Sequence, residues 1–163
     1  MSIEHIQRLS MNPHFYGVLL QAFLSGYNKP CDVRSVFMAL PILLYSESRK
    51  KLLRANNRSK METLFNSSEV IGEDFNISGK VRLSGYIQRF EELKTSCKKA
   101  LIILYSDKKI FLSNYKIILI KPVSYSDYEG TIKNWIRAAY YLGIVFAKTS
   151  EDHLNYFLGV DRK

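Results

Sequence analysis

The chain has 163 residues, of which 47% are hydrophobic and 24% are charged. This length fits one ordinary domain, and the apolar content excludes general disorder, because a disordered chain lacks enough apolar surface to form a core. Twenty-four lysines and arginines against fifteen acidic residues give a net charge of +9, which favours an acidic partner such as nucleic acid, a membrane surface or an acidic protein face.

The first half of the chain, residues 1–66, is predicted to be helical. Asn12-Pro13 supply an N-cap and a first-turn proline, and apolar residues then recur at helical spacing until Gly26 ends the stripe. Asn28-Lys29-Pro30 is expected to turn the chain. Asp32 can cap a second helix that is apolar on nearly all sides. That helix is expected to be the most buried one, and Pro41 is expected to kink or split it.

Two shorter helices complete this half. Ser46 or Ser48 can begin a basic helix that continues over residues 49–55, and Ser59 can cap a short helix that ends at residue 65. Residues 67–80 are rich in Asn, Ser and Gly and are locally acidic. They predict a connection between two helical halves, and not a flexible linker between independent domains.

The second half, residues 81–163, opens with a long amphipathic stretch. Apolar residues at steps of three and four predict a single helix over residues 81–104. Two short runs rich in Ile, Phe and Tyr follow at 109–112 and 115–120, with Ser113-Asn114 between them. This pattern is typical of a β-hairpin.

The C-terminal part allows two interpretations. Ser126-x-x-Glu129 is a capping-box pattern that predicts the start of a helix. In one interpretation Gly143 ends this helix, and residues 144–148 pair with 153–160 as a hairpin wing. In the other, the helix continues through Gly143, and a short last helix covers residues 150–158. We favour the second, because its apolar stripe and its glycine cap both fit.

These elements predict one domain over residues 1–163, of mostly α (α+β) class: a compact helical domain with a small β-hairpin, winged-helix-like. The first ten residues are polar and mixed, so no signal peptide is expected. The longest apolar run, residues 36–45, contains a proline and is too short to span a bilayer. We therefore expect a cytoplasmic protein without a membrane partner.

No motif for a phosphate-cradling loop, a zinc protease or a hydrolase nucleophile is found in the sequence. The three histidines are far apart, and surface or cap roles are expected for them. Cys97 lies on the apolar stripe of the long predicted helix, which favours a buried thiol over a reactive one. We expect no enzymatic activity, no catalytic residue, no cofactor and no metal.

A basic cluster follows the most apolar segment and contains no acidic residue. It consists of Arg49, Lys50, Lys51, Arg54, Arg58 and Lys60. One interpretation is contact with phosphates or with an acidic protein partner. The other is a solvated helix face, partly neutralised by Glu47 and Glu62. Four further lysines on the predicted hairpin form a second basic area, although edge strands often carry lysine simply to discourage aggregation.

Several short hydrophobic signatures occur in order along the chain. They are Asn12-Pro13 before a helix that ends in Gly26-Tyr27, the apolar segment 36–44, the basic stretch 49–53 followed by 59–65, the segment 138–146 with its Leu142-Gly143 pair, and Phe157-Leu158-Gly159-Val160. Together they resemble the middle-component family of prokaryotic three-component ABC-ATPase systems. The resemblance covers nearly the whole chain apart from residues 66–80.

The resemblance implies a small non-enzymatic adaptor. Such a subunit would link an SMC- or Rad50-like ABC ATPase subunit to an effector subunit in a bacterial anti-phage defence complex. ATP would be bound by the partner, and nucleic acid would be reached through the complex. A hetero-oligomer is implied, and the family supplies no catalytic residue to carry over.

Four tyrosines are candidate anchors for such a protein interface, because tyrosine is enriched at interface hot spots. Ordinary core packing is the simpler interpretation of these residues, and we favour it. The four are Tyr125, Tyr128, Tyr140 and Tyr141.

The alternative function is a winged-helix DNA-binding protein or regulator. It is supported by the net charge, the basic cluster and the predicted hairpin. The best candidate for a recognition helix covers residues 132–141, where Lys133, Asn134 and Arg137 supply polar groups for a groove. A hydrolase with a dispersed site is the least favoured hypothesis.

Overall fold

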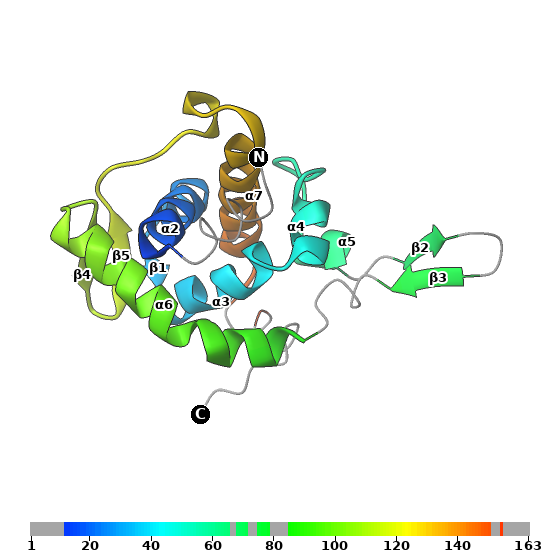
Figure 1. Ribbon diagram of the computed structural model, residues 1–163, viewed down its shortest axis with the longest axis horizontal. Helices are drawn as coiled ribbons and strands as arrows, with labels where there is room; N and C mark the ends of the chain where they lie inside the picture. The colour runs from blue at the N-terminus through cyan, green and yellow to red at the C-terminus, as the bar shows by residue number, and fades with distance from the viewer. Residues whose placement is uncertain (1–11, 66–67, 72–74, 79–84, 151–153, 155–163) are drawn as a thin grey trace.

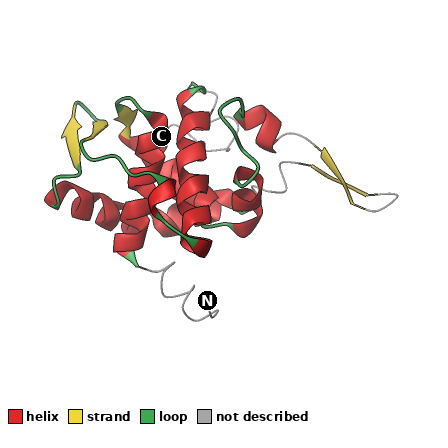
Figure 2. Ribbon diagram, turned by 90° about the horizontal axis from the view of Figure 1, so that it is seen from above, coloured by secondary structure: helices red, strands yellow, loops and turns green. Residues whose placement is uncertain are grey.

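The computed structural model describes residues 12–65, 68–71, 75–78, 85–150 and 154. Helices make up most of this part of the chain, and a small antiparallel sheet lies at one end of them (Figures 1 and 2). The predicted mostly α (α+β) class is therefore confirmed. The winged-helix likeness within it is not confirmed.

Helices α2 (Pro13–Tyr27) and α7 (Gly130–Ala147) form the central pair of the fold (Figure 1). The predicted start of α2 is confirmed, because the Asn12 side chain accepts a hydrogen bond from the backbone N–H of His14 at 2.8 Å. The continuation of α7 through Gly143 is also confirmed. The predicted end of α2 in Gly26-Tyr27 is confirmed: the helix ends at Tyr27, and Asn28 takes a left-handed conformation with φ of 56°.

Gly26 and Gly143 are needed inside these helices because the two backbones approach closely. A Cβ atom on Gly26 would lie 1.8 Å from the carbonyl oxygen of Tyr140, and one on Gly143 would lie 2.0 Å from that of Phe23. The contact is extended by the rings of Phe23 and Phe146, which meet edge to face with centroids 5.3 Å apart. The two glycines thus set the spacing of the central pair.

Helix α3 (Val33–Leu43) is capped by Asp32 as predicted, and its carboxylate accepts from the backbone N–H of Arg34 at 3.0 Å. Its burial is confirmed as well, since most of its residues lie in the core. Pro41 does not split the helix, which ends at Leu43.

The long helix α6 (Tyr86–Ser106) crosses α2 and α3. Its first turns satisfy carbonyl oxygens of α3: the Tyr86 hydroxyl donates to Met38 at 2.8 Å, and the Arg89 Nε donates to Pro41 at 3.2 Å. These contacts fix the angle at which α6 leaves the core. The part of the predicted helix before residue 85 lies outside the described residues.

Helices α4 (Ser46–Leu52) and α5 (Met61–Phe65) follow α3. The segment between them is held by α7, because the Arg137 guanidinium donates to the carbonyl oxygens of Leu53 at 2.8 Å and of Ala55 at 3.2 Å. The Lys148 ammonium group donates to the carbonyl oxygen of Asn57. Basic side chains in and directly after α7 therefore stabilise the end of α4 and the turn that leads to α5.

The three-stranded sheet consists of β1 (Cys31–Asp32), β4 (Ile110–Ser113) and β5 (Lys116–Leu119), in the order β1-β5-β4. The predicted hairpin is β4–β5, whose register pairs Phe111 with Ile118 and Leu112 with Ile117. The chain leaving β5 is fixed to α2, since Gln21 donates from its amide to the carbonyl oxygen of Lys121 at 2.7 Å.

The structure differs from the predicted connection and the predicted capping box, and it does not describe most of the predicted last helix. The predicted connection contains a second antiparallel hairpin of β2 (Ser68–Ile71) and β3 (Phe75–Ser78). The capping box does not form: Ser124 caps a short 3-10 helix, η2 (Tyr125–Asp127), and α7 begins without a side-chain cap. Most of the predicted last helix lies outside the described residues.

Candidate interaction surfaces

Large apolar side chains are exposed together on the last turns of α6 and on the β4–β5 hairpin. We call this group the hairpin surface; its members are Ile102, Tyr105, Phe111, Leu112, Tyr115, Ile118 and Ile120. Single exposed apolar residues are ordinary, but this many on two adjoining elements are typical of an interaction site. The hairpin surface is the strongest candidate functional site in the described part of the chain.

The hairpin surface arises because both faces of β4–β5 are apolar. Ile110 and Ile117 face the core and are buried, whereas Phe111 and its cross-strand partner Ile118 face outward. A hairpin with one solvated face normally alternates apolar with polar residues. The runs of apolar residues carry this signal in the sequence, although by themselves they predict only strands.

The turn of the hairpin holds a tyrosine in an unfavourable conformation. Asn114 and Tyr115 both have positive φ, 51° and 62°, as a two-residue hairpin turn of this hand requires. Glycine is favoured at the second of these positions, but the residue there is Tyr115, whose side chain is 83% exposed. The turn is anchored to α3, because the Val33 N–H donates to the Tyr115 carbonyl oxygen at 3.0 Å.

The basic cluster of the sequence is divided by the structure. The Arg49 guanidinium stacks on the Trp135 ring at 3.6 Å and donates to the carbonyl oxygen of Leu43 at 2.9 Å. Burial lowers the pKa of Arg49, since the charged form loses solvent. Arg49 therefore packs α4 against α7, and this packing removes it from the surface that we consider for anion binding.

The other members of the basic cluster lie along α4 and the turn before α5. Lys50 forms an ion pair with Glu47 at 3.2 Å, as the solvated-face interpretation expects. Arg54 and Arg58 are exposed. Arg137 of the candidate recognition helix donates to carbonyl oxygens of the segment after α4 and stacks at 4.5 Å on Tyr141, so it is directed toward the protein and not toward a groove of DNA.

The four candidate tyrosines are half-buried, and three of them are in contact. The Tyr125 ring lies 5.6 Å from that of Tyr140 and 6.0 Å from that of Tyr141, between centroids. The hydroxyl groups of Tyr125 and Tyr141 are 3.3 Å apart, and this hydrogen bond raises the pKa of Tyr141. Tyr125, Tyr128 and Tyr141 also pack against the core. Such contacts are typical of packing side chains.

The cysteines are placed as core residues. Cys31 and Cys97 are buried and unpaired with each other, and burial raises the pKa of each thiol to about 12. Thiols with such pKa values carry almost no thiolate near neutral pH, which is typical of structural cysteines. Within the described ranges, no group of three or more His, Cys, Asp or Glu side chains is arranged to hold a metal ion.

A family model of the ABC-three component (ABC-3C) system Middle Component 3 matches residues 1–162 of the chain. The chain therefore belongs to the middle components of ABC-three component systems. The resemblance found in the sequence is confirmed at this level. The search of the curated proteins found no match, and neither did the search of the solved structures.

Membership of this family makes the chain one component of a multi-protein system. None of the helices in the described segments is both long and apolar enough to cross a membrane.

Proposed function

We propose that the chain is a non-enzymatic adaptor that links the ABC ATPase subunit of its system to an effector subunit. The hairpin surface carries this proposal, because a component with large exposed apolar side chains needs a partner to cover them. In this function the chain acts through contacts alone, and ATP is bound and hydrolysed by the partner. An anti-phage role and a place in the cytoplasm belong to the same proposal.

The exposed basic residues give the adaptor a second contact area. Arg54 and Arg58, with Lys50, Lys51 and Lys60, lie on α4 and the turn before α5, away from the β4–β5 hairpin (Figure 1). We assign them to an acidic protein face or to nucleic acid held by the complex. Two separate areas of different chemistry suit a subunit that contacts two neighbours.

The test of the adaptor function uses Tyr115→Gly. Glycine adopts positive φ without the cost of about 1–2 kcal/mol that other residues meet there, so we expect the variant to be more stable, by up to about 1 kcal/mol. We expect the same variant to co-purify less with the ATPase and effector subunits, because it lacks an exposed aromatic anchor. Urea unfolding and co-purification from cells that express all three subunits measure the two effects.

The matched control is Asn114→Gly in the same turn, where asparagine already tolerates positive φ and Tyr115 is kept. It should change stability little and keep the complex. The proposal is contradicted when the native chain co-purifies with neither subunit, or when Tyr115→Gly gains stability with no loss of the complex.

A further inference from the structure

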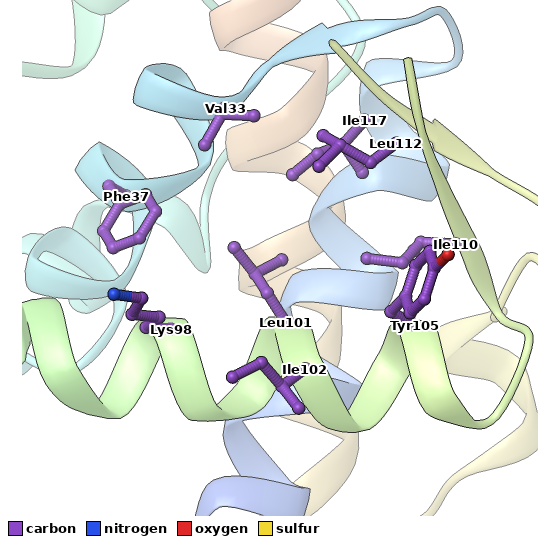
Figure 3. A pocket seen from close by; sticks show the side chains of 9 residues that line it. All are labelled: Val33, Phe37, Lys98, Leu101, Ile102, Tyr105, Ile110, Leu112 and Ile117. Atoms are coloured by element: carbon purple, nitrogen blue, oxygen red, sulfur yellow. The ribbon is translucent and has the colours of Figure 1, made fainter. Parts of the chain in front are cut away.

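A groove lies beside the hairpin surface, between α3, α6 and the sheet, with a cavity volume of about 380 Å³. Side chains from all three elements line it: Val33, Phe37, Lys98, Leu101, Ile102, Tyr105, Ile110, Leu112 and Ile117. Figure 3 shows Leu101 pointing from α6 into the space between Phe37 on one side and Ile110 on the other. Apart from Lys98 and the Tyr105 hydroxyl, every one of these side chains is purely apolar.

The size and shape of the groove suit a helix. Lys98, Leu101, Ile102 and Tyr105 lie at helical positions i, i+3, i+4 and i+7 and form one wall that is about 10 Å long. The volume is within the roughly 300–1,000 Å³ of cavities that enclose drug-sized groups, which is room for several apolar side chains. Grooves between helices commonly receive the apolar face of an amphipathic helix.

The charge around the groove selects the partner. Residues 98–121 contain six lysines and one aspartate, a net charge of +5. The lysines are Lys98, Lys99, Lys108, Lys109, Lys116 and Lys121. Lys98 itself lines the groove, and the other five lie on or directly beside α6, β4 and β5, which form its walls. A second copy of this basic chain would place further positive charge here, so an acidic partner is favoured.

We propose that the groove binds a short amphipathic helix of a partner subunit, whose apolar side chains enter between α3 and α6 and whose Asp or Glu side chains meet Lys98 and the lysines of the adjoining segments. This inference rests on the proposed adaptor function and names the kind of segment that the adaptor recognises. Apolar insertion supplies the affinity, and the charges orient the helix and speed its association.

The test compares two isoleucines of α6 that differ in their relation to the groove. Ile102 lines it and is 58% exposed, whereas Ile87 lies on the same helix outside it and is 46% exposed. The probes are the purified ATPase subunit and the purified effector subunit of the same system. We expect Ile102→Gln to weaken binding to one of them at least about tenfold and Ile87→Gln to change it less than about twofold.

The contribution of the lysines is tested in the same subunit-binding assay. Lys98→Glu at the groove should weaken binding several-fold, and the effect should shrink in high salt, because ions screen exposed charges. Lys133→Glu, an exposed lysine of α7, is the control and should have no effect. A photo-crosslinking amino acid in place of Tyr105 should label a partner segment with apolar residues at spacings of three and four and with acidic residues beside them.

The outcomes separate this inference from the adaptor function. A native chain that binds neither subunit overturns both. Binding that Ile102→Gln and Ile87→Gln affect equally overturns the groove alone, as does a labelled segment without acidic residues. Self-association of the chain that Ile102→Gln abolishes would show that a second copy occupies the groove, and it would also overturn the inference.

Discussion

Gly143→Ala is expected to lower the free energy of unfolding by about 3 kcal/mol or more, because overpacking of a tight core contact has costs of this order. The added Cβ would lie 2.0 Å from the Phe23 carbonyl oxygen and 2.7 Å from the Tyr27 backbone nitrogen. Both atoms belong to backbone, so no side chain can move aside. The central helices would have to separate, and the edge-to-face contact of Phe23 with Phe146 would loosen.

Gly17→Ala is the matched control, because Gly17 is a buried glycine of α2 whose added Cβ would meet Leu104 at an ordinary 3.6 Å. Alanine favours helix by up to about 1 kcal/mol over glycine, so this variant should be as stable as the native chain or more so. Urea unfolding followed by circular dichroism measures both. Equal stability of the two variants would contradict the close approach of α2 and α7.

Arg49→Ala is expected to lower the free energy of unfolding by about 2 kcal/mol, because the variant loses a charge-assisted hydrogen bond and a cation–π contact. Removal of a partly desolvated charge offsets some of this loss. The two contacts are those with the Leu43 carbonyl oxygen and the Trp135 ring. Both join α4 to its neighbours, so the variant should also loosen α4 and expose Trp135 to solvent.

The control for this prediction is Arg54→Ala, five residues further along the chain and exposed. It should change stability by less than about 0.5 kcal/mol, as is usual for surface substitutions. Chemical unfolding followed by the fluorescence of Trp135, the single tryptophan, reports on both variants. The assignment of Arg49 to packing is refuted when Arg54→Ala costs as much stability as Arg49→Ala.

Much of the fold could be predicted from the sequence because local signals agreed with the tertiary contacts. Asn12 and Asp32 cap their helices as their residue types favour, and the apolar stripes correctly predicted α3 and α6. Glycine was the ambiguous signal. Gly26 ends the apolar stripe in the sequence, whereas in the structure it lies inside α2 because the Tyr140 backbone leaves no room for a side chain there. No local pattern reveals that contact.

Less of the candidate site could be predicted. Arg49 belongs to the basic cluster in sequence, but its position one turn into α4 directs the guanidinium onto Trp135 of α7, a contact 86 positions away in sequence. The hairpin surface was not predicted because strand residues with two apolar faces resemble buried strands in sequence. The structure shows β4 at the edge of the sheet and exposed apolar residues on α6. Within the described residues, no further element covers them.

The account as a whole is tested most directly by hydrogen–deuterium exchange of the chain, alone and in complex with the ATPase and effector subunits. We expect the backbone amides of β4, β5 and the last turns of α6 to exchange more slowly in the complex, because a partner covers the hairpin surface and the groove beside it. Amides of α2 and α7 should change little, since they lie in the core already. A stable complex in which the hairpin and α6 exchange as fast as in the free chain would contradict the account.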